Sequence, residues 1–234
     1  MNKTYAFSDI HGMYNLWKQI KEYCDETDTI YFLGDAADRG PDGIKIINEL
    51  LYDKRVKFIK GNHEDMLALC VPDLIEGYCY NMFWWFDNGG DSTWNTLERC
   101  SDDSKMWYVH KINQLPEFAW YESPLGHRVF LTHAGTDLHW TKEEREQIIK
   151  QAYLWDRKHF NFTHPVNMPD VIQVHGHTPT KNLAKVIGLP QTTDVITYCD
   201  GHKIDIDCGA FATKKVALID LDTFEVKYFY EEQI

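Results

Sequence analysis

The sequence has little positive charge. Its 234 residues include 36 Asp and Glu but only 24 Lys and Arg, which gives a formal net charge of −12. Proteins that bind a nucleic-acid backbone need clustered Lys and Arg to neutralise phosphates, so this composition argues against nucleic acid as the main partner. A phosphate-binding site in this chain would need another source of positive charge, and bound divalent cations are a common one.

Long apolar runs and paired cysteine motifs are also missing. No run of 18 or more apolar residues is present, and no basic segment followed by an apolar stretch precedes Asp9. We therefore expect no membrane span, no secretion signal and a cytoplasmic location. The six cysteines form no C-x-x-C pair, and a chain of this size does not need disulfides to fold. We expect free thiols, most of them buried.

The composition that remains is that of an ordinary globular protein, with 44% apolar and 26% charged residues. No internal repeat, low-complexity segment or Pro/Ser-rich linker divides the chain. At 234 residues it suffices for one large domain or two small ones, and we expect a single domain over residues 1–234. The oligomeric state is not encoded in any pattern that we recognise.

The first 60 residues alternate between strand and helix patterns. Strand-like runs at 3–7, 29–33 and 56–59 are separated by apolar residues at helical spacing, first from Met13 to Tyr23 and then from Ile44 to Leu51. This β-α-β-α-β order predicts an α/β fold with neighbouring parallel strands.

A tryptophan-rich segment follows, and we expect residues 65–114 to be mostly helical, with a turn at Asn88-Gly89-Gly90. It is predicted to form a flank or lid over a site; the alternative is that its part from 82 to 107 is a protein-docking surface. Further strands are predicted at 118–121, 128–132 and 171–174, with a helix at about 141–153. The last third is predicted to form antiparallel strands at 202–207, 215–221 and 225–230.

Five short segments rich in potential metal ligands come directly after predicted strands. Ligands of open α/β sheets bind beyond the carboxyl ends of the strands, so these segments should converge in space. Their carboxylate, amide and imidazole groups suit Mn, Fe or Zn better than Ca, and without cysteine they do not form a thiolate zinc site. The segments are Ser8-Asp9-Ile10-His11-Gly12, Gly34 to Gly40 (GDAADRG), Gly61-Asn62-His63-Glu64, Leu131 to Gly135 (LTHAG) and Val174 to Pro179 (VHGHTP).

Each segment taken alone has a purely structural explanation. Asp9 could cap the next helix, Asp38 and Arg39 could form a surface ion pair in a tight turn, and His133 or His177 could be a structural histidine. Five such coincidences at five predicted strand ends are much less expected by chance than any one of them. The set as a whole therefore favours a metal site.

In order, the motifs D-x-H-G, G-D-x-x-D-R-G, G-N-H-E, H-A-G and G-H-T-P resemble the PPP-type metallophosphatases within the calcineurin-like phosphoesterases. The resemblance extends from residue 9 to about 210 and is strongest to the compact bacterial and phage Ser/Thr protein phosphatases, whose features Asn88-Gly89-Gly90, Trp155-Asp156-Arg157 and Ile206 to Ala210 also match. Ser8 and Ala134 replace glycines of the usual pattern, and both are small. The resemblance implies the calcineurin-like metallophosphoesterase fold, a central β-sandwich flanked by helices.

The resemblance also implies a role for each motif residue. Two divalent metal ions are expected, with Mn²⁺ first and Fe, Zn or other first-row ions as alternatives. Phosphate would be bound by Arg39 and Arg157, and His63 would be the general acid, oriented by Asp38. The implied metal ligands are Asp9 and His11 for the first ion, Asp35 bridging both, and Asn62, His133 and His177 for the second. His175, which stands two residues before His177, is predicted to be structural.

The implied activity is hydrolysis of phosphate monoesters, phosphoserine and phosphothreonine of proteins above all, by in-line attack of a metal-bound hydroxide. The alternative within the same superfamily is a symmetrical dinucleoside tetraphosphatase, which cleaves a phosphoanhydride in a small molecule. Glu64 and the G-H-T-P motif favour the protein phosphatase. A non-catalytic binding module on the same scaffold is a third hypothesis; the complete ligand set with His63 and both arginines argues against it.

Overall fold

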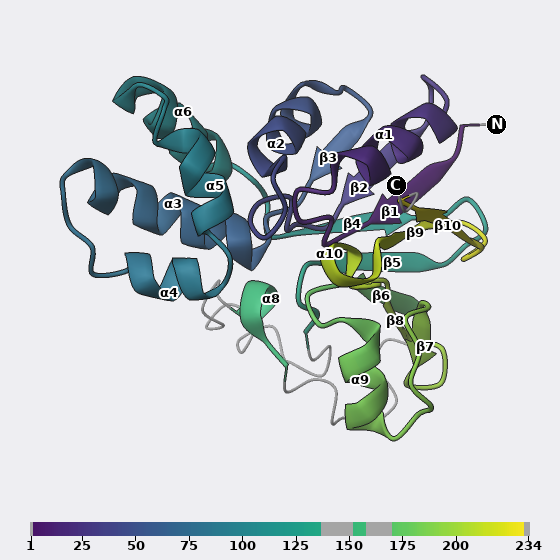
Figure 1. Ribbon diagram of the computed structural model, residues 1–234. Coiled ribbons are helices and arrows are strands. Elements are labelled where there is room, and N and C mark those ends of the chain that lie inside the picture. The colour runs from purple at the N-terminus through teal and green to yellow at the C-terminus, as the bar shows by residue number, and fades with distance from the viewer. Residues whose placement is uncertain (1, 137–151, 158–169, 232–234) are drawn as a thin grey trace, which may run out of the picture.

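Two five-stranded sheets form the centre of the part that the structure describes. The computed structural model describes residues 2–136, 152–157 and 170–231. Within these residues the two mixed sheets form a sandwich and helices lie around it (Figure 1). The expected α/β class, a central β-sandwich flanked by helices, is confirmed.

The first sheet contains the predicted parallel strands. Its order is β10-β9-β1-β2-β3, in which β1 pairs in parallel with β2 and β2 with β3, while β9 and β10 are antiparallel. The two crossovers are the predicted helices, α1 (Tyr14–Tyr23) and α2 (Gly43–Tyr52). The strands are β1 (Thr4–Phe7), β2 (Thr29–Phe32), β3 (Val56–Phe58), β9 (Lys215–Asp220) and β10 (Val226–Tyr230).

Alternating side chains along these strands build two apolar layers. Phe7 and Phe32 face the helices, where Phe7 stacks on Trp17 of α1 with ring centroids 5.6 Å apart. Ala6 and Tyr31, one position earlier on the same strands, belong to the cluster between the sheets. This follows from the two-residue period of a strand, and each fully buried large apolar side chain adds about 1.5–3 kcal/mol to stability.

The second sheet has the order β4-β5-β6-β8-β7. The prediction that the last third forms antiparallel strands is only partly right: β8 is antiparallel to β7 but parallel to β6. An unpredicted helix, α9 (Thr180–Ile187), lies in the connection from β6 to β8. Its eight residues are too few to give a clear helical period in the sequence. The strands are β4 (Phe118–Glu122), β5 (Arg128–Thr132), β6 (Val171–His175), β7 (Ile196–Tyr198) and β8 (Lys203–Asp205).

The tryptophan-rich segment forms a group of helices beside the sheets (Figure 1). Its members are α3 (Asn62–Ile75), α4 (Met82–Asp87), α5 (Asp91–Leu97) and α6 (Asp102–Asn113). Two short helices, α8 (Ala152–Trp155) and α10 (Ala210–Thr213), complete the described elements. Most of the helix predicted at 141–153 lies outside the described residues.

Two further expectations concern the whole chain. Every helix in the described residues is too short or too polar to cross a membrane. All six cysteines are free thiols, as predicted, but only three of them are buried, so the expectation that most are buried is wrong.

Candidate active site

The predicted ligand residues lie at the carboxyl ends of five strands, and the loops that carry them are tied together by backbone hydrogen bonds. The amide of Asp9 donates to Gly34 O and that of His11 to Asp35 O, both at 2.9 Å, so the loops after β1 and β2 are in register. The loops after β5 and β6 are joined in the same way, because Gly176 N donates to His133 O at 2.8 Å. Segments up to 168 residues apart in sequence thus meet at one point.

The backbone at this point is strained. Ten non-glycine residues of the described ranges have a positive φ, a conformation that costs of order 1 kcal/mol or more for an L-residue. Such strain persists where surrounding contacts over-determine it, and it concentrates at functional sites. Six of the ten are predicted site residues: Asp9, His11, Asp35, Asp38, Arg39 and His177.

One half of the site is a cluster of four buried side chains. Asn62 Oδ1 lies 2.8 Å from His133 Nε2 and 2.9 Å from His177 Nδ1. The two ring nitrogens are 3.2 Å apart, and Asp35 Oδ2 is 3.4 Å from His133 Nε2. Because His133 Nδ1 bonds to Leu33 O at 2.8 Å, the Nε2 lone pair of a neutral His133 points into this cluster. Four acceptor atoms then converge, which is the chemistry of a cation site.

The other half surrounds His11. Its Nδ1 donates to Ala37 O at 2.9 Å, so its Nε2 is an acceptor that faces Asp35 Oδ2 at 3.6 Å. The guanidinium of Arg39 donates to the same Nε2 at 2.5 Å. A positive group of the chain itself therefore already lies against this nitrogen.

The ligand atoms fall into two groups in which all atoms lie within 4.8 Å of one another: His11 with Asp35 and His63, and Asp35 with His133 and His177. Asp35 belongs to both groups. Nitrogen and oxygen donors in this mixture fit first-row divalent ions. Asp9 is outside both groups, but its Oδ2 accepts from His177 N at 3.0 Å, so it borders the second one.

The electrostatics fit a cation as well. His133 and His63 hold the pKa of Asp35 well below its usual range although burial opposes this, so Asp35 is a carboxylate. Burial and the neighbouring His63 lower the pKa of His11 well below normal, which keeps its ring neutral. Burial opposes the charge of His133, but Asp35 outweighs it and raises the pKa of His133 to about 9. The cluster therefore favours a positive charge beside Asp35.

His63 of the first ligand group also forms, with Asp38, a hydrogen-bonded pair that suits proton transfer. His63 Nδ1 is 2.7 Å from Asp38 Oδ2, and both side chains are buried. Burial opposes the charge of His63, yet Asp35 and Asp38 raise its pKa above the usual value. Its Nε2 lies 3.1 Å from Arg39 Nη2. Unlike the other predicted site residues, Arg39 and Arg157 are exposed, so an anion can reach them from solution.

Two residues with positioning contacts were not assigned a role from the sequence. Glu64 is fully buried, and its carboxylate accepts from the amides of Gly61, Asp35, Ala36 and Ala37 at 2.8–3.2 Å. Thr178 Oγ1 lies 3.1 Å from Arg157 Nε. Both stand inside motifs that we quoted, but the motif pattern does not reveal which neighbour they bind.

His175 behaves as a structural residue, as predicted. Its ring is buried, and its Nε2 lies 2.8 Å from Tyr198 Oη on β7, which β8 separates from β6. It is outside both ligand groups.

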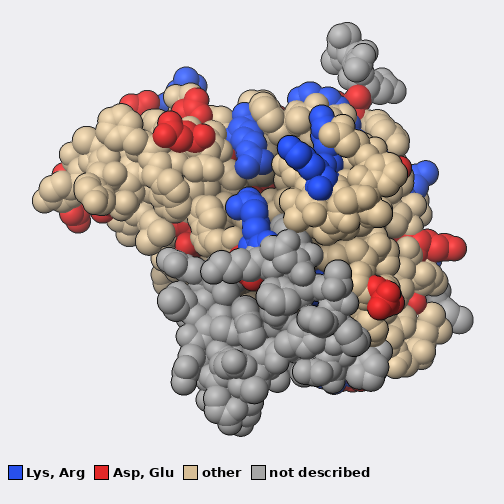
Figure 2. All heavy atoms as spheres, turned by 90° about the horizontal axis from the view of Figure 1, so that it is seen from below, with Lys and Arg blue, Asp and Glu red and all other residues tan. Residues whose placement is uncertain are grey.

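Lys and Arg side chains gather near the middle of the face drawn in Figure 2, along the boundary between the helical group and the sheets. Most acidic side chains of this face lie nearer its margins. In the described part of this face, basic side chains are thus grouped together although the formal net charge of the chain is −12.

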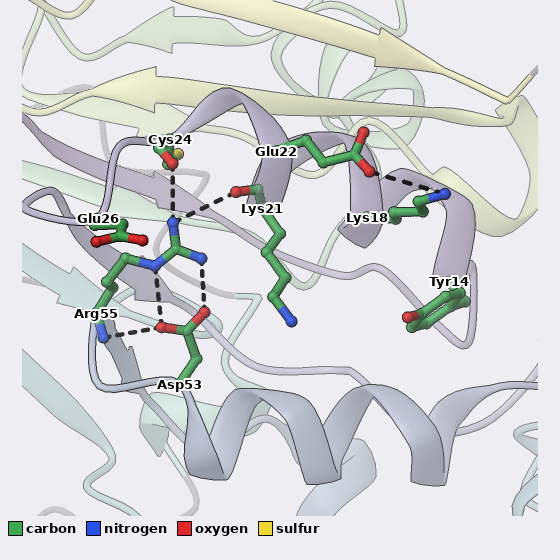
Figure 3. Close-up of a pocket in the computed structure, with 8 residues that line it drawn as sticks. All are labelled: Tyr14, Lys18, Lys21, Glu22, Cys24, Glu26, Asp53 and Arg55. Atoms are coloured by element: carbon green, nitrogen blue, oxygen red, sulfur yellow. Dashed lines mark hydrogen bonds and ion pairs between the residues drawn. The ribbon is translucent and has the colours of Figure 1, made fainter.

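A cavity of about 570 Å³ near the start of β3 is not a second phosphate site. Its arginine, Arg55, forms two bonds to Asp53 and further bonds to backbone carbonyls (Figure 3). Lys21 is paired with Glu49 at 2.9 Å. Arg55 and Lys21 are therefore already paired with groups of the chain. The cavity also lies at the amino ends of the parallel strands, whereas ligands of such sheets bind at the carboxyl ends.

Comparison with known proteins agrees with the motifs. The family model described as calcineurin-like phosphoesterase matches residues 3–208. A symmetrical bis(5'-nucleosyl)-tetraphosphatase of Buchnera aphidicola from Acyrthosiphon pisum (strain 5A) is 28% identical over 141 residues, which are 58% of this chain and 46% of the relative. A zinc-dependent endopolyphosphatase of Saccharomyces cerevisiae is 36% identical over 81 residues, 31% of this chain and 25% of that protein. The chain spans less than half the length of these curated relatives.

Solved structures share the fold. A putative diadenosine tetraphosphatase gives a TM-score of 0.65 with 16% identity, covering 98% of this chain and 93% of that one. A protein serine/threonine phosphatase of Saccharomyces cerevisiae gives 0.62 with 13% identity, covering 100% and 81%. The family match covers most of the sequence and contains all the predicted site residues. The chain therefore belongs to the calcineurin-like phosphoesterases, a family of hydrolases that work at a dinuclear metal centre.

Proposed function

We propose that this protein hydrolyses phosphate monoesters with two divalent ions, Mn²⁺ first among them, and that phosphoserine and phosphothreonine of proteins are among its substrates. The observation that carries the proposal is the position of Asp35 in both ligand groups, next to the 2.7 Å pair of His63 and Asp38. One ion would be held by Asp9, His11 and Asp35, and the other by Asp35, Asn62, His133 and His177. Bound ions would supply an activated water and neutralise phosphate charge.

The chain's own residues supply the remaining chemistry. Arg39 and Arg157 are exposed and fork-shaped, which suits bidentate contacts with phosphate oxygens and leaves the phosphoryl group oriented for in-line attack. Against the effect of burial, Asp35 and Asp38 raise the pKa of His63 above its usual value, which favours the charged ring, and His63 would give its proton to the leaving oxygen. Burial of His63 and Asp38 excludes water that would compete for that proton.

The test is a hydrolysis assay with p-nitrophenyl phosphate and Mn²⁺. We expect turnover that EDTA abolishes and that added Mn²⁺ restores. Substitution of His63 by Gln should lower kcat while bound Mn²⁺, measured by equilibrium dialysis, stays the same. Turnover that is insensitive to EDTA would refute the two-ion proposal, and full activity of His63→Gln would refute the proton donor.

Symmetrical cleavage of dinucleoside tetraphosphates is a second candidate function, and it has at least as much support as a protein substrate. The Buchnera relative carries that activity in its name. In the motif pattern, Glu64 favours a protein phosphatase. In the structure described, its carboxylate accepts only from backbone amides, so Glu64 does not distinguish between the two leaving groups.

An aromatic pair beside the site also suits a nucleotide. Trp84 stacks on Trp155 with ring centroids 5.5 Å apart, and Trp155 lies edge-on to His177 at 6.2 Å. Trp84 is 41% exposed, so one face of the pair is open to a base, and base stacking on an aromatic ring contributes about 1–3 kcal/mol.

Trp84→Ala should therefore raise KM for diadenosine tetraphosphate by about tenfold and leave that for p-nitrophenyl phosphate unchanged. Trp120→Ala is the matched control, because Trp120 is similarly exposed at 38% but lies on β4. Equal KM values of wild type and Trp84→Ala would rule out base stacking on Trp84, and no turnover of the dinucleotide by wild type would rule out this candidate function.

A further inference from the structure

The carboxylate of Asp38 is held from two directions. Its Oδ2 accepts from His63 Nδ1 at 2.7 Å and from Trp85 Nε1 at 2.9 Å. Its Oδ1 accepts from Thr93 Oγ1 at 2.6 Å. Asp38 is fully buried, and both of its oxygens have donors with fixed directions, so the carboxylate cannot rotate.

The two extra donors come from the helical group. Trp85 lies on α4 and Thr93 on α5, 47 and 55 residues along the chain from Asp38. Both side chains are buried, and Trp85 is among the largest fully buried ones. Neither of them belongs to a ligand group.

The same two helices also fix the backbone that carries Asp38. The amide of Asp38 donates to Thr93 Oγ1 at 2.8 Å, and the amide of Arg39 donates to Gly89 O, in the turn between α4 and α5, at 2.9 Å. Asp38 and Arg39 have φ values of 68° and 65°, a left-handed pair that needs such external bonds to persist. A side chain at Gly89 would meet Arg39 Cγ at 2.8 Å, so the turn is pressed against this loop.

We propose that Trp85 and Thr93 are positioning residues of the reaction: they clamp Asp38 so that His63 presents its proton to the leaving oxygen. The inference rests on the proposed function and deepens it. It assigns α4 and α5 a part in proton donation in addition to their place beside the sheets. Their effect on turnover should then depend on how much the leaving group needs a proton.

This dependence provides the test. A phenolate leaving group, with a pKa of about 10 as in tyrosine, needs protonation far more than the acidic p-nitrophenolate does. The variants are Trp85→Phe, which keeps the ring but removes the N–H, and Thr93→Val, which keeps the shape but removes the hydroxyl. Thr93→Ser retains the hydroxyl, and Trp94→Phe changes the neighbouring residue on α5.

With phenyl phosphate we expect kcat to fall about tenfold or more in Trp85→Phe and Thr93→Val, a part of the 10²–10⁴-fold that general acids contribute. With p-nitrophenyl phosphate the fall should stay below about threefold. KM for both esters should be unchanged, because Arg39 and Arg157 are intact. Thr93→Ser and Trp94→Phe should behave like wild type.

Three results would overturn the clamp. They are an equal fall of kcat with both esters, a raised KM with unchanged kcat, or a kcat of Thr93→Ser as low as that of Thr93→Val. Thermal unfolding and Mn²⁺ binding of each variant show whether the fold and the ligand groups are kept. A wild-type protein that hydrolyses neither ester would instead refute the proposed function, so the two failures are distinguishable.

Discussion

Glu64→Gln should destabilise the protein more than any other change of a carboxylate to its amide outside the proposed ligands. Glu64 Oε1 accepts from the amides of Ala36 and Ala37 at 2.8 and 3.2 Å, and Oε2 accepts from Asp35 and Gly61 at 2.8 and 2.9 Å. Glutamine has the same shape but replaces one oxygen by an NH₂ group. Whichever way it turns, two buried amides then face a donor.

The size of the effect follows from those two amides. Burial raises the pKa of Glu64 to about 7, so the magnitude applies above pH 7, where Glu64 is charged. Hydrogen bonds to a charged group contribute about 1.5–3 kcal/mol each, so the loss is about 3–6 kcal/mol, out of about 5–15 kcal/mol for a whole domain. At about 2–4 °C per kcal/mol for a chain of this size, Tm should fall by about 6–24 °C.

Circular dichroism melting of wild type and variant, with EDTA and with Mn²⁺, measures this. Glu49→Gln is the matched control. Glu49 also accepts three hydrogen bonds, from Tyr14, Trp17 and Lys21, but its side chain is 25% exposed, so water can replace a lost partner. Its Tm should change by less than about 4 °C. A Tm of Glu64→Gln no lower than that of Glu49→Gln would refute the reasoning.

Three further outcomes are expected. Asp35→Asn should reduce Mn²⁺ binding at both sites and Asp9→Asn at one, as counted by equilibrium dialysis; one full equivalent retained by Asp35→Asn would contradict the bridging role. Asp38→Asn removes one of the carboxylates that raise the pKa of His63, so the proton donor is lost at lower pH and the alkaline limb of kcat should move to lower pH; an unmoved limb would argue against it. Gly176→Ala places a methyl group on Asp9 Oδ2 and should destabilise by about 1–3 kcal/mol in urea unfolding, whereas an unchanged midpoint would show that Asp9 can move away.

The strand ends could be predicted from sequence because their signal is local. Asp9, Asp35 and Asn62 each stand a few residues after a short apolar run, and the carboxyl ends of parallel strands meet at one edge whatever the rest of the chain does. The ligand roles themselves stay predictions that rest on the family resemblance.

The parts that could not be predicted depend on distant contacts. Trp85 and Thr93 bond to Asp38 across about 50 residues, and nothing in the spacing of the tryptophan-rich segment identifies which indole reaches the site. The parallel pairing of β8 with β6 likewise depends on α9, whose eight residues carry too weak a pattern. That the tryptophan-rich segment is a lid or a docking surface stays a prediction.

The loop from Asp35 to Gly40 explains why the motif alone does not specify the site. Its six successive amides all donate to acceptors outside the loop: Glu64 takes the first three, Thr93 the fourth, Gly89 O the fifth and His11 O the sixth. A buried amide without a partner would cost about 1–3 kcal/mol, so these acceptors, supplied by α3, α5, the turn between α4 and α5 and the loop after β1, hold the left-handed residues in place. The motif supplies the proposed ligand Asp35 and the carboxylate of Asp38 that bonds to His63, whereas the helical group fixes the direction of the Asp38 carboxylate. Substitutions in α4 and α5 should therefore alter catalysis without removing a single ligand.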